Sequence, residues 1–98
     1  MKYLSHPGVT LRHFRYVIEV AEQLNFSRAA LLLHVAQPSL SKQIRDLELL
    51  MGVWLFDRTK RNVSLTRAGK MFAKDGYEIL RRSDKAIRRT KRARTTTT

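Results

Sequence analysis

The sequence predicts a mainly α-helical chain with three short helices, a two-stranded β-hairpin and a long last helix. In four segments, apolar side chains recur at spacings of three and four residues, which is typical of helices with one buried face. Between the third and the last of these segments, residues 53–56 and 63–65 are β-prone and flank a polar, turn-like stretch. We divide the 98 residues into a lead-in (1–10), one small domain (11–65), a long helix (66–90) and a disordered tail (91–98).

Two short helices are predicted at the start of the domain. Thr10 is an N-cap candidate for the first, which should end near Asn25. Its apolar positions are Leu11, Phe14, Val17, Ile18, Ala21 and Leu24. Ser27 is predicted to cap a second helix of about seven residues, in which Ala29 and Ala30 are small enough to let another helix approach closely.

The third helix is predicted to have two different sides. Pro38 fits its first turn, because the leading amides there have no intrahelical partner, so the helix should begin close to Gln37. Gly52 can take the left-handed conformation that often ends a helix. The apolar side consists of Leu40, Ile44, Leu47 and Met51, and the polar side of Gln37, Ser41, Lys42 and Arg45. One side therefore builds a core, while the other is free to face DNA.

The long last helix is predicted to pair with a copy of itself. Thr66 is its N-cap candidate, and a seam at close to 3.5-residue spacing follows. The seam consists of Ala68, Phe72, Gly76, Ile79, Ser83 and Ala86 or Ile87. Because a helix this long cannot bury its apolar stripe on one small domain, we expect a homodimer. Beyond Arg88 the basic run and the four closing threonines predict disorder.

Composition favours a nucleic-acid partner and excludes several other classes of protein. The net charge is +12, with +4 in residues 1–66 and +8 in residues 67–98, so a polyanion is the natural partner. The absence of Cys removes disulfides and Cys-ligated zinc, and the three His share no metal-ligand spacing. No apolar run is long enough for a membrane span, so we expect a cytoplasmic protein. No nucleophile, base or phosphate-loop pattern is present, so we expect neither an enzyme nor a cofactor.

An ordered set of short motifs spans the predicted domain and the start of the last helix. It consists of Leu11-Arg12-x-Phe14, Phe26-Ser27-x-Ala29-Ala30, the run from Ala36 to Ile44, Leu47-Glu48, Gly52-x-x-Leu55-Phe56-x-Arg58 and Leu65-Thr66-x-Ala68-Gly69. Residues 11–90 thereby resemble the N-terminal DNA-binding region of the LysR-type transcriptional regulators. The resemblance implies a winged helix-turn-helix with a linker helix. It also implies sequence-specific binding of double-stranded DNA, as a dimer on an interrupted inverted repeat, to regulate bacterial transcription.

The resemblance also suggests which residues contact DNA. Gln37 and Ser41 would reach base edges, and Gln suits adenine. Lys42 would donate to guanine or phosphate, which the sequence leaves open, and Pro38 offers apolar contact at most. Arg61, at the wing tip, would reach the minor groove or backbone. The complete predicted DNA-binding set is Ser27, Gln37, Pro38, Ser41, Lys42, Arg45, Lys60 and Arg61.

Several features have two interpretations. Arg58 could form a salt bridge with Asp57 or contact a phosphate, and we favour the salt bridge. Trp54 is better suited to packing in the wing than to stacking on a base. Ala36 replaces a capping Ser of many relatives, and Leu49 stands on the polar side of the third helix.

The functional prediction also has alternatives. Relatives continue into an effector domain, so no small-molecule effector is expected in this chain. We also consider a truncated regulator that forms mixed dimers with a full-length relative, and a non-specific DNA binder.

Overall fold

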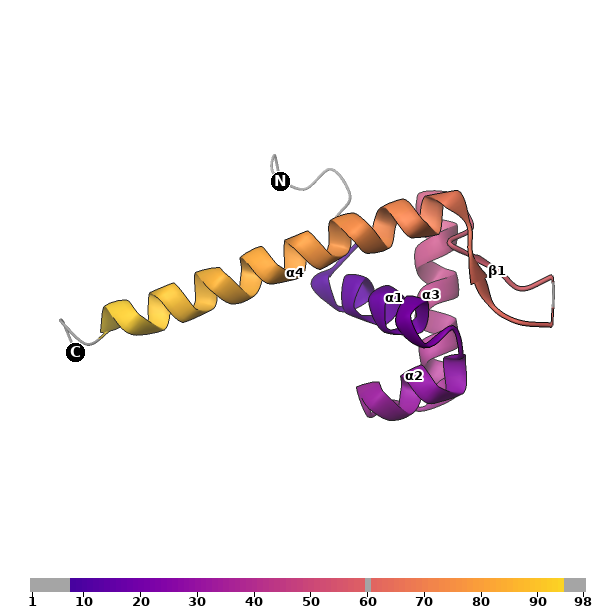
Figure 1. The fold of residues 1–98 in the computed structure, drawn as a ribbon, viewed down its shortest axis with the longest axis horizontal. Helices are drawn as coiled ribbons and strands as arrows, with labels where there is room; N and C mark the ends of the chain where they lie inside the picture. Colours follow the sequence, from indigo (N-terminus) through magenta and orange to yellow (C-terminus); the bar gives the residue numbers. More distant parts are fainter. Residues whose placement is uncertain (1–7, 60, 95–98) are drawn as a thin grey trace.

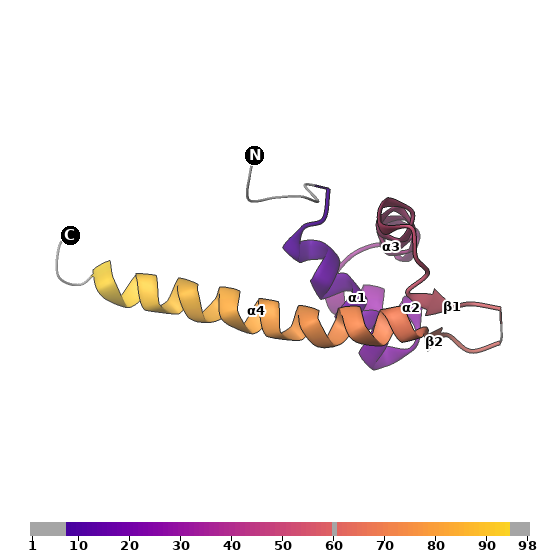
Figure 2. The same ribbon diagram turned by 90° about the horizontal axis from the view of Figure 1, so that it is seen from above.

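The computed structural model describes residues 8–59 and 61–94 and confirms the predicted fold class. Its elements are α1 (Leu11–Gln23), α2 (Phe26–Leu33), α3 (Gln37–Met51), β1 (Phe56–Asp57), β2 (Ser64–Leu65) and α4 (Arg67–Ala93). Helices α1 to α3 gather into one body, the hairpin extends from one side of it, and α4 continues well beyond it on the other (Figure 1). The view from above shows α1 lying beside the first half of α4 (Figure 2).

The core lies where the helices meet the start of the wing. Its fully buried apolar residues are Val17, Val20, Ala29, Ala30, Leu40, Ile44, Leu47, Leu55 and Phe56. The two alanines of α2 are buried, as their size predicted. Phe56 also meets the ring of Phe26 edge to face, with 5.7 Å between the centroids. The wing is thus anchored to the helical body through β1.

Most predicted helix ends are confirmed. Thr10 precedes α1 in extended conformation, and Thr66 Oγ1 accepts from the amide of Gly69 at 3.0 Å. Gly52 ends α3 with φ 72°, a conformation that glycine adopts without strain. Ala36 provides no side-chain cap to α3, as expected. These features depend on neighbouring residues alone.

The start of α2 corrects the prediction for Ser27. The N-cap is Asn25, whose Oδ1 accepts from the amide of Arg28 at 2.9 Å. A cap must lie just outside the helix with extended backbone, and Asn25 has φ −158° and ψ 113°. Ser27 lies inside the first turn instead. Helix α1 correspondingly ends at Gln23, before the predicted end near Asn25.

The wing is shorter than the β-prone segments suggested. Phe56 pairs with Leu65 and Asp57 with Ser64 in an antiparallel register. Residues 53–55 lie outside the strand: Leu55 is buried in the core, and a single backbone hydrogen bond, from the amide of Thr66 to its carbonyl at 3.0 Å, extends the hairpin beyond the paired residues. At the predicted wing tip, Lys60 lies outside the described residues and Arg61 is exposed.

The first half of the predicted dimer seam packs inside the chain. Phe72 stacks on Phe14 of α1, with ring centroids 4.5 Å apart and planes 10° apart. A Cβ at Gly76 would lie 2.7 Å from Phe14 Cδ1, so glycine is needed for this approach of α4 to α1. Ala68 packs against the same core. Phe72 and Gly76 thus pack on α1 of the same chain, although Ala68 and Phe72 also line an open apolar groove.

The second half of α4 extends past the predicted helix end. The helix continues to Ala93, so residues 91–93, predicted as part of a disordered tail, are helical. Lys, Arg and Ala are good helix formers, and cations near a helix C-terminus interact favourably with the helix dipole. Residues 95–98 of the predicted tail lie outside the described residues.

Candidate DNA interface

The polar side of α3 is uncovered along its length. Gln37 and Arg45 are exposed and Ser41 is half-buried between them, at successive four-residue steps that place all three on one face of the helix. Lys42 is exposed beside them. Leu40, Ile44 and Leu47 are buried on the opposite side. The predicted division of this helix into a core side and a free side is confirmed.

Two of these polar side chains already have partners. Gln37 Nε2 donates to Ser41 Oγ at 2.7 Å. Lys42 Nζ lies 2.8 Å from Asp46 Oδ2, and the hydrogen bond and negative charge of Asp46 raise the pKa of Lys42. Both pairs are exposed, so another donor or acceptor can displace them at little cost. Sequence reasoning missed Asp46, although the four-residue spacing of a Lys and an Asp on one helix predicts such a pair.

Arg45 is held by an aromatic ring. Its Cζ lies 5.5 Å from the centroid of the Trp54 ring. Trp54 is 54% exposed, so the predicted packing of this ring inside the wing is wrong. Its carbonyl accepts from Thr66 Oγ1 at 2.6 Å, which fixes the chain where it enters the wing.

Glu48 joins α3 to the wing, a role that sequence reasoning missed. The residue is 2% exposed. Its Oε2 accepts from the amides of Leu55 at 2.8 Å and Phe56 at 3.2 Å, and its Oε1 accepts from Arg58 Nη1 at 3.1 Å. A sequence signal existed, because Glu48 follows Ile44 by four residues and so falls on the buried side of the helix.

Arg58 therefore pairs with Glu48, and the favoured salt bridge with Asp57 is wrong. Its guanidinium also lies over the rings of Phe26 and Phe56, at 5.2 and 6.0 Å. The carboxylate of Asp57 accepts from the amide and the hydroxyl of Thr59 instead. Arg58 pairs with Glu48, ten residues away, and not with the adjacent Asp57. The reason is that Glu48 is buried, so its charge needs a compensating partner.

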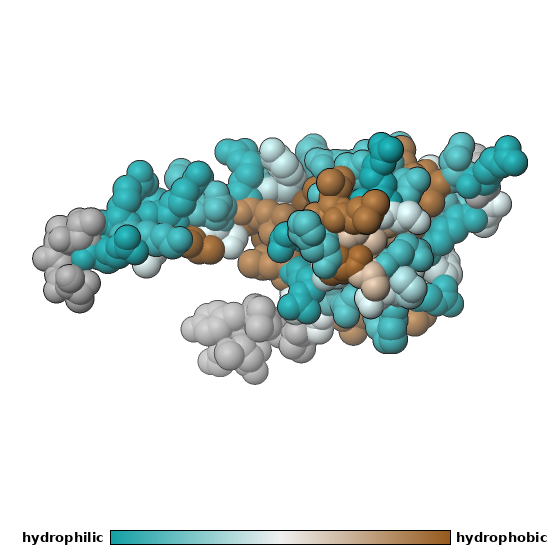
Figure 3. Space-filling view, turned by 90° about the horizontal axis from the view of Figure 1, so that it is seen from below, coloured by the Kyte–Doolittle hydropathy of each residue, from teal (hydrophilic) through white to brown (hydrophobic). Residues whose placement is uncertain are grey.

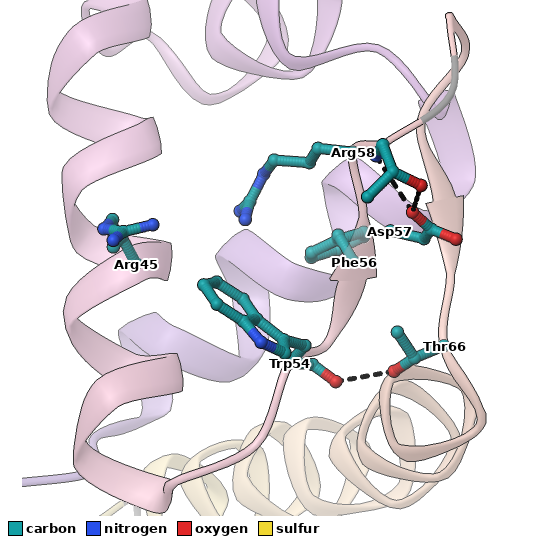
Figure 4. Close-up of a pocket in the computed structure, with 7 residues that line it drawn as sticks. Arg45, Trp54, Phe56, Asp57, Arg58 and Thr66 are labelled. Carbon is teal, nitrogen blue, oxygen red and sulfur yellow. Dashed lines mark hydrogen bonds between the residues drawn. The ribbon is translucent and has the colours of Figure 1, made fainter.

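A crevice of about 360 Å³ separates α3 from the wing. Figure 4 shows Arg45 on one wall and Arg58 on the other, with their guanidinium groups turned into the same space and Trp54 below them. The remaining lining residues are Phe56, Asp57, Thr59 and Thr66.

The other predicted contacts are more scattered. Ser27 and Pro38 are exposed in the first turns of α2 and α3, and Arg61 is exposed on the wing. Within residues 8–59 and 61–94, no group of His, Asp and Glu is arranged to hold a metal ion. No helix in the described part of the chain is long and apolar enough to cross a membrane.

The family profile described as "Bacterial regulatory helix-turn-helix protein, lysR family" matches residues 11–70. The chain belongs to the LysR family. The Hca operon transcriptional activator HcaR of Escherichia coli is 55% identical over 76 residues, which cover 78% of this chain and 26% of that protein. The regulator AlsR of Bacillus subtilis is 55% identical over 62 residues, 63% of this chain and 20% of that protein. This LysR-family chain thus spans roughly a quarter of the length of such relatives.

Solved structures agree with this assignment. The DNA-binding domain of BenM, in a complex with catB site 1 DNA, superposes with a TM-score of 0.87 and 37% identity, covering 92% of this chain and all of that one. The DNA-binding domain of CbnR, also in a DNA complex, gives a TM-score of 0.81 and 38% identity over 87% of this chain and 98% of that one. The described LysR-family fold is therefore the helix-turn-helix DNA-binding domain of transcriptional regulators, and the family supports a non-enzymatic role.

Proposed function

We propose that this chain reads a specific double-stranded DNA site in the bacterial cytoplasm, as a homodimer on an interrupted inverted repeat, and thereby regulates transcription. The uncovered polar side of α3 carries this proposal. Gln37, Ser41 and Lys42 lie at its leading end, where a helix in the major groove reaches base edges. Their present partners are exposed side chains that bases can replace.

Base readout by α3 is tested with Gln37→Ala. The variant should lose about 1–3 kcal/mol of binding on a site selected from random duplexes and much less on unrelated DNA, because a bidentate contact to a base is lost. Gln23→Ala on α1 is the matched control, since Gln23 bonds Glu19 away from this face. Equal losses of Gln37→Ala on both duplexes would reject the assignment.

The wing is proposed to contact the minor groove or backbone through Arg61, with Lys60 beside it. Arg61 is exposed near the end of the hairpin, so its guanidinium is accessible to DNA. Arg61→Ala should reduce the magnitude of the slope of log K against log salt by roughly one, because one phosphate contact is lost. Binding titrations at several salt concentrations measure this slope, and an unchanged slope and affinity would leave Arg61 as ordinary surface.

A second copy is proposed to cover the outer half of α4. Ile79 and Ile87 continue the apolar stripe past α1, 40% and 53% exposed, with the small Ser83 between them. An apolar groove of about 370 Å³ between α1, the end of α3 and α4 leads into this stripe through Met71 and Ile79. In Figure 3 apolar surface gathers where α4 crosses the helical body. We propose that the α4 helix of a second copy covers this groove and the exposed isoleucines beyond it.

Sedimentation tests the dimer. Ile79→Asp and Ile87→Asp should give folded monomers that lose most affinity for a site with two half-sites, because the two copies no longer bind together. Lys85→Asp, on the opposite side of α4 by the helical period, is the control. A monomeric unmodified chain at high micromolar concentration would contradict the proposal.

A further inference from the structure

The crevice lies between α3 and the wing, the two elements proposed to enter neighbouring grooves of DNA. In B-DNA a major groove and the adjacent minor groove are separated by a single sugar–phosphate strand. A protein that places a helix in one groove and a wing in the other straddles that strand. For a domain docked in this way through α3 and the wing, that strand would pass over the crevice of about 360 Å³ between them.

The two arginines of the crevice are oriented before any ligand arrives. Arg45 rests over the Trp54 ring, and Arg58 is held by Glu48 and by the rings of Phe26 and Phe56. Both guanidinium groups face the space between the walls (Figure 4). A guanidinium fixed in this way loses little conformational entropy when it binds an anion.

The charges in the crevice favour an anion. No acid among the described residues pairs with Arg45, so its full charge is available. Arg58 uses one of its five N–H donors on Glu48, and its side chain is 33% exposed. The Asp57 carboxylate keeps its negative charge, but it lies on the other side of β1 from the two guanidinium groups (Figure 4), where it accepts from the amide and hydroxyl of Thr59. Arg45 therefore contributes charge, and Arg58 contributes mainly hydrogen bonds.

We propose that this crevice binds one phosphate of the DNA strand lying between the two grooves, with Arg45 and Arg58 as its ligands and with Trp54 and Glu48 as positioning residues. The proposal rests on the proposed function, because it requires docking through α3 and the wing. It assigns a role to Trp54, the half-exposed ring that neither the core nor base readout explains. It also gives Arg45 a different role from Lys42, because Lys42 forms an ion pair with Asp46.

The test replaces single phosphates of the selected site by neutral methylphosphonate, one position at a time. The unmodified chain should lose roughly ten- to a hundredfold in affinity at one phosphate between the major-groove and minor-groove contacts. Arg45→Gln should bind unmodified DNA correspondingly more weakly and become insensitive at that phosphate alone. Arg45→Lys should restore part of this sensitivity, because it keeps the charge.

Two further variants separate positioning from folding. Trp54→Leu leaves Arg45 in place without its ring and should reduce the loss at the same phosphate, while circular dichroism shows an intact fold. Arg15→Gln removes an exposed charge from α1 outside the crevice and should leave the loss unchanged. The crevice site would be overturned if Arg45→Gln lost as much affinity as the unmodified chain at the neutralised phosphate. It would also be overturned if the unmodified chain lost no affinity at any phosphate between the grooves. Either result would leave base readout by α3 standing. A selection that yields no preferred duplex would overturn both proposals.

Discussion

Replacing Glu48 should separate the wing from the helical body. In Glu48→Leu, the buried amides of Leu55 and Phe56 lose their acceptor, at about 1–3 kcal/mol for each group left unsatisfied. Arg58 loses its partner too, but its side chain is one-third exposed and water can solvate it. The two unsatisfied amides together give an expected loss of about 2–6 kcal/mol.

That loss is large for a domain of this size. Small domains have unfolding free energies of about 5–15 kcal/mol, so Glu48→Leu should lose a large part of its stability. Glu48→Gln keeps a carbonyl acceptor without the charge and should lose only about 1–2 kcal/mol.

Urea unfolding followed by circular dichroism gives both values through the midpoint and slope. Glu22→Leu, on the exposed side of α1, is the control and should stay within about 0.5 kcal/mol of the unmodified chain. If the unfolding free energy of Glu48→Leu were within about 1 kcal/mol of that of the unmodified chain, the wing would be anchored by other contacts and this reasoning would be refuted.

Three further predictions follow from packing, titration and capping. Phe72→Asp should cost about 3–5 kcal/mol of stability in thermal unfolding, because it destroys the stack on α1, whereas Ile79→Asp should leave the melting temperature nearly unchanged. Burial and the charge of Arg12 lower the pKa of His13 below its ordinary 6.5, and its Nδ1 accepts from the amide of Thr10. The unfolded chain therefore binds more protons just below pH 6.5, so stability should fall as the pH drops through that value, and His13→Gln should flatten the dependence of melting temperature on pH. Asn25→Ala should lose about 1 kcal/mol of unfolding free energy, while Ser27→Ala should lose less than half of that, and the reverse order would restore Ser27 as the cap.

The features that the sequence predicted well are local. Pro38 in the first turn of α3, Gly52 at its end and Thr66 at the start of α4 each act through backbone groups within four residues. The buried and free sides of α3 follow from the helical period alone. For that reason the polar row of Gln37, Ser41 and Arg45 was predictable before any fold was known.

The features that tertiary structure decided join distant parts of the chain. The sequence placed an aromatic at position 72 in a seam, but its stack on α1 became evident only from the position of Phe14 in the folded chain. Asp57 and Glu48 were both possible partners for Arg58, and burial of Glu48 decided the pairing. Local propensities depend on a residue and its neighbours, whereas burial and desolvation depend on which surfaces meet when the whole chain folds.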